Sequence, residues 1–507
     1  MSRRVTAIAL GLASAVAVGV LWGTDWPLGV PGQWTWERIP YGESNRFGSL
    51  LGAFQALLSV VAVVLAGWAG ERLMPRPRHG QLPRAGVPAV CLIGLIFTGF
   101  LSQQLLQQSL PPGYGIERSP WVLYYPGSSG YYFEARRVTS MENFRERYLG
   151  VLTDPSPHRR TLHLGTHPPG LFLFHLGVRE SCRRIPVLRD TLLSWQPTSV
   201  RRAGTTILEG GRPIPPVDTA ALWLAALMTQ LAAVATAIPL YGLVRIDHPH
   251  RTAWRASVLW MLVPAVTIFL PKSDCLYPFV AVTATWLWWS SLRGGQRWRA
   301  VLAGLVVTLG LSLSLAFLPA FALAAILSLN IAVRDSWSGR KYLGWCVASA
   351  TGAAIPILAC WVLTEINLVS AWWHNFQNHA AFYDQPENPR SYLPWLGVNL
   401  IEATLAVGIP LSGLTAAGLM ARLRHKALTM SAPGWACLVT WGMLWLSGKN
   451  MGEAARLWLL LLPWACWVSA MALDRLRQQD WLLLLACQAV LAAATVARIS
   501  GFHFAGL

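Results

Sequence analysis

The chain has 507 residues, of which 54% are hydrophobic and 13% are charged, about half the charged fraction of an average soluble domain. So few charges cannot cover the water-facing surface of a protein of this size, which excludes a soluble protein and makes lipid the natural solvent for much of the chain. The formal charge of +18 is spread over short basic clusters between apolar segments, so no nucleic-acid partner is expected.

Apolar segments long enough to cross about 30 Å of hydrocarbon recur along the whole chain. The first follows Arg3 and Arg4 without a clean small-residue cleavage site, so we interpret it as an uncleaved helix. The segments are 5–23, 50–70, 87–108, 217–243, 254–270, 275–291, 300–317, 319–334, 343–365, 394–420, 432–447, 454–473 and 481–498. The predicted fold is therefore an all-α polytopic membrane protein, one multi-pass domain over residues 1–507 with about thirteen transmembrane helices.

Basic residues in the linkers indicate the orientation of these helices. Cytoplasmic loops favour Lys and Arg, and an N-terminus on the inside places all the basic linkers there. Those linkers are 71–86, 244–255, 292–299, 334–342, 421–426 and 474–478. The longest polar segment, 109–216, then becomes a large extracytoplasmic loop, and loops of this length usually carry function.

One amphipathic helix is expected within this loop, between residues 134 and 152. Phe144, Tyr148 and Leu152 fall on one face of such a helix, with Arg and Glu residues elsewhere. We expect this helix to lie on the outer leaflet of the membrane.

A second element is expected at residues 170–178, which are apolar but too few to span the bilayer. We predict an interfacial or re-entrant element. Pro168 and Pro169 end any helix before them and can start one directly after, which leaves Gly170 at a close-packed position. His167 would then lie at the mouth of a helix, where its imidazole could contact a phosphate or a sugar, although a histidine that only caps or packs fits equally well.

Acids, bases and aromatic residues are densest at 131–148 and 163–175. A carboxylate such as Glu134 or Glu142, held at the membrane edge, could act as a general base toward an acceptor hydroxyl. The alternative is an amphipathic helix whose charges are simply solvated. The candidate substrate-binding residues of the loop are Arg136, Arg137, His163 and His167.

The segments YYFEARRV, which begins at Tyr131, and THPPG, which begins at Thr166, resemble the polytopic GT-C glycosyltransferases, among them protein mannosyltransferases and lipid A aminoarabinose transferases. The resemblance covers about a third of the chain, with residues 87–108 in the place of the first core helix. It implies transfer of a sugar from a polyprenyl-phosphate carrier on the external face. Glu134 stands where the family usually has an Asp or an Asp-Glu pair, and two extra N-terminal helices also depart from the family pattern.

Two of the four lysines lie at external helix edges beside acids, Lys272 near Asp274 and Lys449 near Glu453. Charged groups at membrane depth are costly and tend to mark substrate sites, and Arg456 lies one helical turn beyond Glu453. Local ion pairing that only stabilises the loops is the alternative interpretation. By resemblance to related transferases, Asp274 and Tyr277 are secondary candidates at the end of a core helix. The candidate substrate-binding residues outside the loop are Lys272, Asp274, Tyr277, Lys449, Glu453 and Arg456.

The sequence lacks a glycine-rich nucleotide loop, an HExxH motif and a nucleophile elbow, so a lipid-linked donor is favoured over a nucleotide sugar. The eight cysteines form no disulfide framework or zinc spacing, and the sparse paired acids give no support to a divalent-cation site, so no cofactor is predicted.

The hypothesis is a glycosyltransferase of a bacterial cytoplasmic membrane, whose partners are a lipid-linked sugar donor, membrane lipids and an acceptor that the sequence does not identify. A secondary transporter for a sugar or anion and a non-catalytic membrane assembly factor remain as alternatives.

Overall fold

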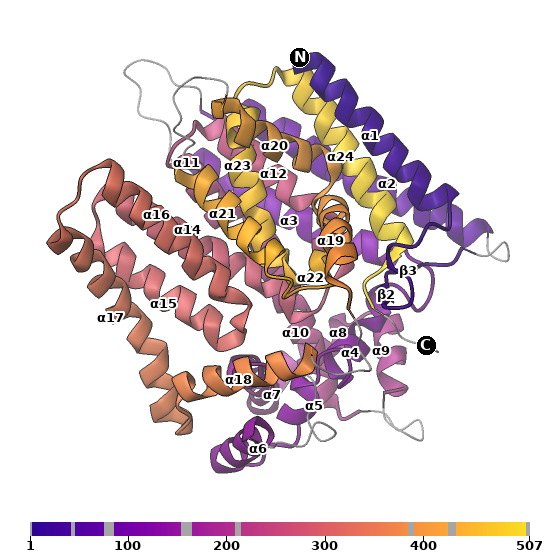
Figure 1. Ribbon diagram of the computed structural model, residues 1–507. Helices are drawn as coiled ribbons and strands as arrows, with labels where there is room; N and C mark the ends of the chain where they lie inside the picture. The colour runs from indigo at the N-terminus through magenta and orange to yellow at the C-terminus, as the bar shows by residue number, and fades with distance from the viewer. Residues whose placement is uncertain are drawn as a thin grey trace.

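The computed structural model describes residues 3–41, 46–75, 86–153, 165–207, 214–383, 390–423 and 432–502. Within these residues the chain is almost entirely helical, and its only sheets are two pairs of two-residue strands (Figure 1). The predicted all-α fold class is confirmed. His163 lies outside the described residues.

Each of the thirteen predicted segments is helical over most of its length. The helices of this bundle are α1 (Arg3–Gly23), α2 (Arg46–Leu73), α3 (Gly86–Gln108), α10 (Pro216–Ala235), α11 (Ala237–Arg245), α12 (His250–Met261), α13 (Pro264–Ile268), α14 (Tyr277–Gly294), α15 (Arg297–Leu313), α16 (Leu318–Arg334), α17 (Gly339–Thr364), α19 (Tyr392–Val407), α20 (Ile409–Leu423), α21 (Ala432–Leu446), α22 (Ala454–Leu457), α23 (Leu462–Asp474) and α24 (Gln478–Arg498). Short 3₁₀ turns join some of them: η4 (Ser273–Leu276), η5 (Leu315–Phe317) and η6 (Leu459–Leu461).

Seven helices in the described residues are long and apolar enough to cross a membrane, which makes the chain an integral membrane protein. They span Arg4–Gly23, Leu50–Leu73, Gly86–Gln108, Pro216–Arg245, Leu315–Arg334, Gly339–Thr364 and Gln478–Arg498. An eighth span results if α19 and α20, which meet at a bend of 108°, are counted as one. The count of thirteen and the orientation of the bundle therefore stay predictions.

The bend between α19 and α20 is stabilised by a buried glutamine. Gly408 takes up a left-handed conformation between the two helices, with φ +97°. The side-chain amide of Gln488 on α24 donates to the carbonyls of Val407 at 2.8 Å and Leu262 at 2.9 Å. Because backbone carbonyls freed inside a membrane find no water, this one side chain supports both the α19–α20 bend and the interruption that follows α12.

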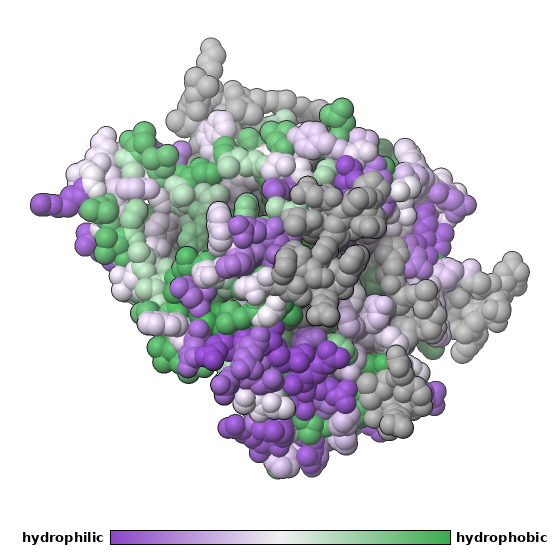
Figure 2. All heavy atoms as spheres, turned by 60° about the horizontal axis from the view of Figure 1, so that its bottom comes forward, coloured by the Kyte–Doolittle hydropathy of each residue, from purple (hydrophilic) through white to green (hydrophobic). Residues whose placement is uncertain are grey.

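The described residues between 109 and 215 form a cap of short helices at one end of the bundle. They are η2 (Ile116–Arg118), α4 (Ser119–Tyr124), α5 (Tyr131–Ala135), α6 (Met141–Thr153), α7 (Gly170–Arg184), α8 (Pro186–Trp195) and α9 (Thr198–Thr205), and α18 (Leu368–Tyr383) packs against α6 there. Figure 1 shows this cap at the end of the molecule opposite the start of α1. Figure 2, turned so that the same end comes forward, shows hydrophilic residues gathered over it.

The predicted amphipathic face is confirmed, since Phe144, Tyr148 and Leu152 are all buried. The helix itself begins at Met141 and not near residue 134, because a turn separates it from α5, and the Ser140 hydroxyl accepts a hydrogen bond from the backbone N–H of Asn143 at 3.1 Å. Its position on the outer leaflet stays a prediction.

The helix predicted to start after the two prolines is α7, which begins at Gly170 as expected. A Cβ at Gly170 would lie 2.3 Å from the carbonyl oxygen of Ser312, so this position is close-packed, as predicted. The helix has 15 residues and packs against α5 and α10 without qualifying as a span.

Segments from the two ends of the chain are joined by a strand pair. β3 (Glu37–Arg38) pairs antiparallel with β4 (Ile499–Ser500), and the Ile39 N–H donates to the Arg498 carbonyl at 2.8 Å. A second pair, β1 (Gly29–Val30) with β2 (Trp34–Thr35), forms the turn before it.

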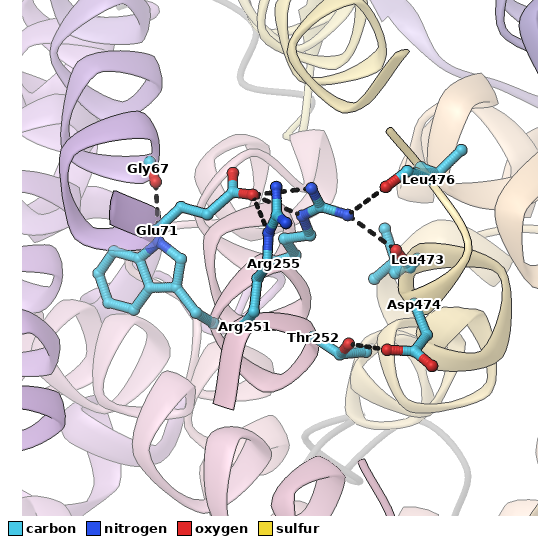
Figure 3. Close-up of polar contacts among 9 residues, drawn as sticks. Gly67, Glu71, Arg251, Thr252, Arg255, Leu473, Asp474 and Leu476 are labelled. Atoms are coloured by element: carbon cyan, nitrogen blue, oxygen red, sulfur yellow. Dashed lines mark hydrogen bonds and ion pairs between the residues drawn. The ribbon is translucent and has the colours of Figure 1, made fainter. Parts of the chain in front are cut away.

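At the end of the bundle opposite the cap, a buried ion pair connects three helices. The Arg255 guanidinium on α12 donates to Glu71 on α2 at 2.7 Å, and both side chains are only 2% exposed. Figure 3 shows Arg255 lying between Glu71 on one side and the carbonyls of Leu473 and Leu476 on the other, with distances of 2.8 and 3.1 Å. Arg251 also contacts Glu71 but is 42% exposed.

We expect removal of Arg255 to destabilise the bundle far more than removal of Arg251. Arg255→Leu leaves Glu71 buried without its main partner, which costs about 3–5 kcal/mol, whereas Arg251→Leu breaks a partly solvated contact worth about 1 kcal/mol or less. Thermal unfolding of the two variants in detergent, followed by tryptophan fluorescence, compares them. An equal fall in Tm for both variants would contradict this assignment.

Candidate functional site

Asp218, which the sequence did not single out, organises the cap. It lies in the first turn of α10 and is 1% exposed, and its carboxylate accepts hydrogen bonds from Tyr132 at 2.7 Å and from Arg179 at 2.9 Å. Arg136 forms an ion pair with its other oxygen at 3.1 Å. A carboxylate is favoured at a helix N-terminus. The sequence signal was an acid two residues after a pair of prolines that start a helix, at the end of an Arg-rich segment.

These contacts bring three segments of the loop together. Tyr132 belongs to α5, Arg179 to α7 and Asp218 to α10, so one buried carboxylate fixes how the cap sits on the bundle. Arg136 also donates to the Tyr124 hydroxyl at 2.9 Å. Arg136 therefore has a structural partner, and its predicted contact with substrate stays a prediction.

We expect Asp218→Asn to loosen the cap while the bundle remains folded. The substitution keeps the shape of the side chain but removes the charge that faces two guanidinium groups, at a cost of about 3 kcal/mol. Limited proteolysis should then cut within residues 109–215 more rapidly, with little change in the fragment pattern of residues 216–502. Asp190→Asn, which alters an exposed acid of the same cap, is the control.

A second group of ionisable residues gathers where the cap meets the bundle. It combines residues from α5, from the turn before α14 and from the start of α22, and we call it the Lys272 cluster. Its members are Tyr131, Lys272, Asp274, Tyr277, Glu453 and Arg456. Five of them were predicted as substrate-binding residues from the sequence, and the structure brings these five together.

Electrostatic interactions connect the members of this cluster. Arg456 forms an ion pair with Glu453 at 2.8 Å, and Lys272 interacts with both of them and with Asp274. Tyr131 interacts in turn with Asp274, Tyr277 and Arg456. Glu453 has a left-handed backbone with φ +57°, a conformation that is uncommon for a residue with a side chain and that is often found at functional sites.

Lys272 is buried without a close partner. It is 4% exposed, and in the described part of the chain no hydrogen bond and no carboxylate within 4 Å engages its ammonium group. Burial, together with the nearby Arg456, lowers its pKa to about 8, although Asp274 and Glu453 act in the opposite direction. A buried, unpaired cation beside a second cation is an arrangement that an anion would stabilise.

Asp274 is the acid of this cluster whose carboxylate is not held by another side chain in the described residues. It is half-buried, and among the described residues no hydrogen bond or ion pair within 4 Å holds its carboxylate. Glu453, by contrast, is bound to Arg456. The cluster can therefore bind an anion and, at Asp274, accept a proton.

Two histidines contact the ring of Tyr131, which we call the aromatic wall of the cluster. The His167 ring is 5.8 Å from the Tyr131 ring in an edge-on contact, and the His167 carbonyl accepts hydrogen bonds from Tyr148 and from Asn375, both at 3.1 Å. His175 stacks on Tyr131 at 6.3 Å. Burial lowers the pKa of His175 to about 3, so its ring stays neutral, and neither nitrogen has a hydrogen-bond partner among the described residues.

Glu134 lies one helical turn from Tyr131, but its carboxylate is already bound. Arg137 contacts one oxygen at 3.2 Å and Arg147 contacts the other. A general base needs a free lone pair directed at the substrate, so these contacts favour a structural role for Glu134. Arg137 is also stacked over the Phe133 ring at 3.9 Å. Glu142 lies exposed in the first turn of α6.

Lys449 does not join the cluster through any contact in the described residues. It is exposed, and its ammonium group lies over the Phe376 ring of α18 at 5.8 Å. No group of three or more His, Cys, Asp or Glu residues in the described part of the chain is placed to hold a metal ion.

Comparison with known proteins gives a limited result. No family model and no curated protein matches the chain. Ten chains of solved structures match, and one is an oligosaccharyltransferase from Archaeoglobus fulgidus, solved in complex with Zn and sulfate. It is 14% identical with a TM-score of 0.40, over 80% of this chain and 53% of that one.

This chain thus spans about half the length of the archaeal protein, and a TM-score this low does not establish a shared fold or activity. The fold defines the protein as an all-α integral membrane protein, and its function has to be argued from the site.

We expect anion binding at the Lys272 cluster to weaken as pH rises through about 8. Because the pKa of Lys272 is lowered to about 8, the ammonium loses its proton there, whereas an exposed lysine would stay charged to about 10. Sulfate keeps the same charge over this range, and its affinity, measured by calorimetry, should fall roughly tenfold, or about 1.4 kcal/mol, between pH 7 and pH 9. Lys272→Arg should abolish this pH dependence; a wild-type affinity that is flat across the range would contradict the assignment.

Proposed function

We propose that the protein is a membrane glycosyltransferase that moves a sugar from a polyprenyl-phosphate carrier to an acceptor hydroxyl. The Lys272 cluster supports this proposal. The cations Lys272 and Arg456 lie together with the Asp274 carboxylate, which has no hydrogen bond among the described residues, where the bundle meets its cap. A phosphate on a membrane lipid presents its charge at this depth, and cations that stabilise a leaving phosphate are the main requirement of such a transfer.

In the proposed reaction the oxygen of the acceptor hydroxyl attacks the anomeric carbon of the donor sugar. The bond between that carbon and the phosphate oxygen breaks, and its electron pair leaves with the polyprenyl phosphate. Asp274 takes the proton of the hydroxyl as general base, and Lys272 and Arg456 stabilise the negative charge that develops on the phosphate. Inversion at the anomeric carbon follows from this single displacement.

This mechanism places the general base at Asp274 instead of Glu134 or Glu142. The Asp274 carboxylate interacts with both cations of the cluster without being hydrogen bonded, whereas Arg137 and Arg147 occupy Glu134. We assign Glu134 to positioning, since it holds α5 and α6 together beside Tyr131. His163 and Lys449 remain predicted contacts of the substrate.

The proposal also includes the location of the reaction. With the N-terminus inside, the cap and the Lys272 cluster face the extracytoplasmic side of a bacterial cytoplasmic membrane, where a lipid-linked donor is the natural source of activated sugar. The nature of the sugar and of the acceptor is left open.

Asp274→Asn should lower the turnover of protein reconstituted with polyprenyl-linked sugars by roughly 100-fold or more, because a positioned general base contributes at least that much. Glu134→Gln, compared at an equal amount of folded protein, should retain most of the turnover. Mass spectrometry of the released polyprenyl phosphate and of the glycosylated product gives the rate. If Glu134→Gln lost turnover and Asp274→Asn retained it, Glu134 would be the general base.

A secondary transporter is the second candidate, and the 108° bend between α19 and α20 favours it, since transporters often bind substrate at interrupted helices. Proteoliposomes distinguish the two functions. Counterflow of a free sugar or anion without chemical change supports transport, and release of polyprenyl phosphate supports transfer.

A further inference from the structure

A cavity of about 560 Å³ lies between α1, α13 and α19, beside the N-terminal strands. Small side chains of α1, including Ala13 and Ala17, face it together with large apolar ones such as Phe269 and Leu405. Cavities of this size hold small ligands in many proteins. Because α1 qualifies as a membrane span, hydrocarbon chains of the bilayer are the molecules that meet this part of the protein.

One ionisable side chain lines the cavity. Among its lining residues, all of which the structure describes, Glu402 is the only ionisable one. One of its carboxyl oxygens accepts hydrogen bonds from the indole of Trp36 at 2.9 Å and from the N–H of Ala455 at 3.0 Å. The other oxygen is buried and has no hydrogen-bond partner within the described chain. A buried polar atom without a partner is costly, and a ligand that hydrogen bonds with it would remove that cost.

The charge of the lining residues favours a lipid with a hydroxyl group over one with a phosphate head group. No cation lines the cavity to receive a phosphate head group, and a phosphate placed there would face a carboxyl group. A hydroxyl group fits, because it can donate a hydrogen bond to an ionised carboxylate and accept one from a protonated carboxyl. The two threonine hydroxyls of the lining are satisfied within their own helices: the Thr404 hydroxyl donates to the Leu400 carbonyl and the Thr495 hydroxyl to the Leu491 carbonyl.

We propose that this cavity binds the hydrocarbon chain of an uncharged lipid whose hydroxyl-bearing head group hydrogen bonds with Glu402. It is a site separate from the Lys272 cluster, whose cations suit a charged head group. The two adjoin, since Ala455 lines the cavity and Arg456, the next residue, belongs to the cluster. The binding itself does not depend on the transferase reaction.

Photolabelling of the intact protein in nanodiscs tests the proposal. The probe is a monoacylglycerol with a diazirine in its acyl chain, compared with the lysophosphatidic acid that carries the same chain. Peptide mapping by mass spectrometry should place the monoacylglycerol label on α1 and α19, and excess unlabelled monoacylglycerol should remove it. Equal labelling of these helices by the two lipids would overturn the proposal.

Two alanines of α1 provide a matched pair of variants. Ala17→Trp fills the cavity and should reduce labelling roughly tenfold, whereas Ala15→Trp adds the same bulk on the exposed side of the same helix and should leave it unchanged. Glu402→Leu should also reduce labelling, and Glu402→Gln, which still donates and accepts hydrogen bonds, should retain it. If neither Ala17→Trp nor Glu402→Leu lowers labelling, the cavity is not the binding site. Transfer activity is not the readout, so a negative result here leaves the proposed reaction unaffected.

Discussion

The arrangement of the candidate site depends on the Asp218 carboxylate. It is almost fully buried, and it is held by Tyr132 and Arg136 at α5 and by Arg179 of α7. A buried carboxylate is tolerated only when its partners are fixed in place, so the charge holds α5 and α7 against α10. Because α5 also carries Tyr131, the same carboxylate determines where the aromatic wall of the Lys272 cluster lies.

Two buried cations of this protein differ in how the fold surrounds their charge. Arg255 has a carboxylate and two carbonyls around it. Lys272 is buried to a similar degree, but among the described residues no hydrogen bond or close ion pair engages its ammonium group, and burial lowers its pKa. A charge that the fold leaves unpaired at such cost is a strong indication of a ligand, and this contrast gives more support to the proposed function than the similarity to any solved structure does.

Much of the fold follows from the sequence, because runs of apolar residues have few alternatives to helices in lipid. The positions of Lys272, Asp274 and Arg456 beside helix ends were enough to select them as a group. What the sequence could not indicate was which charges neutralise one another. Arg137, in the turn after α5, and Arg147, on α6, both contact Glu134, and the relative position of these two segments is set by tertiary packing. The Lys449 ammonium lies over the Phe376 ring of α18.

The breaks within the predicted helices could not be predicted from the sequence either. The 394–420 segment is continuous in hydropathy, and its sharp bend at Gly408 becomes understandable only when Gln488, eighty residues later in the chain, is seen to satisfy the freed carbonyl. Asp218 was missed for the same reason, since its importance comes from three partners that are distant in sequence or directed by the packing of short helices.

The pairing of β3 with β4 has a consequence for the biogenesis of the protein. Helices can enter the membrane one after another as the ribosome extends the chain, but β3 cannot form its pairing with β4 until residues 499–500 have been synthesised. Trp36, which directly precedes β3, supplies one of the hydrogen bonds that fix Glu402. The N-terminal part of the molecule is therefore completed last, and a translation product that stops before residue 499 would insert most of its helices while this corner stays unassembled.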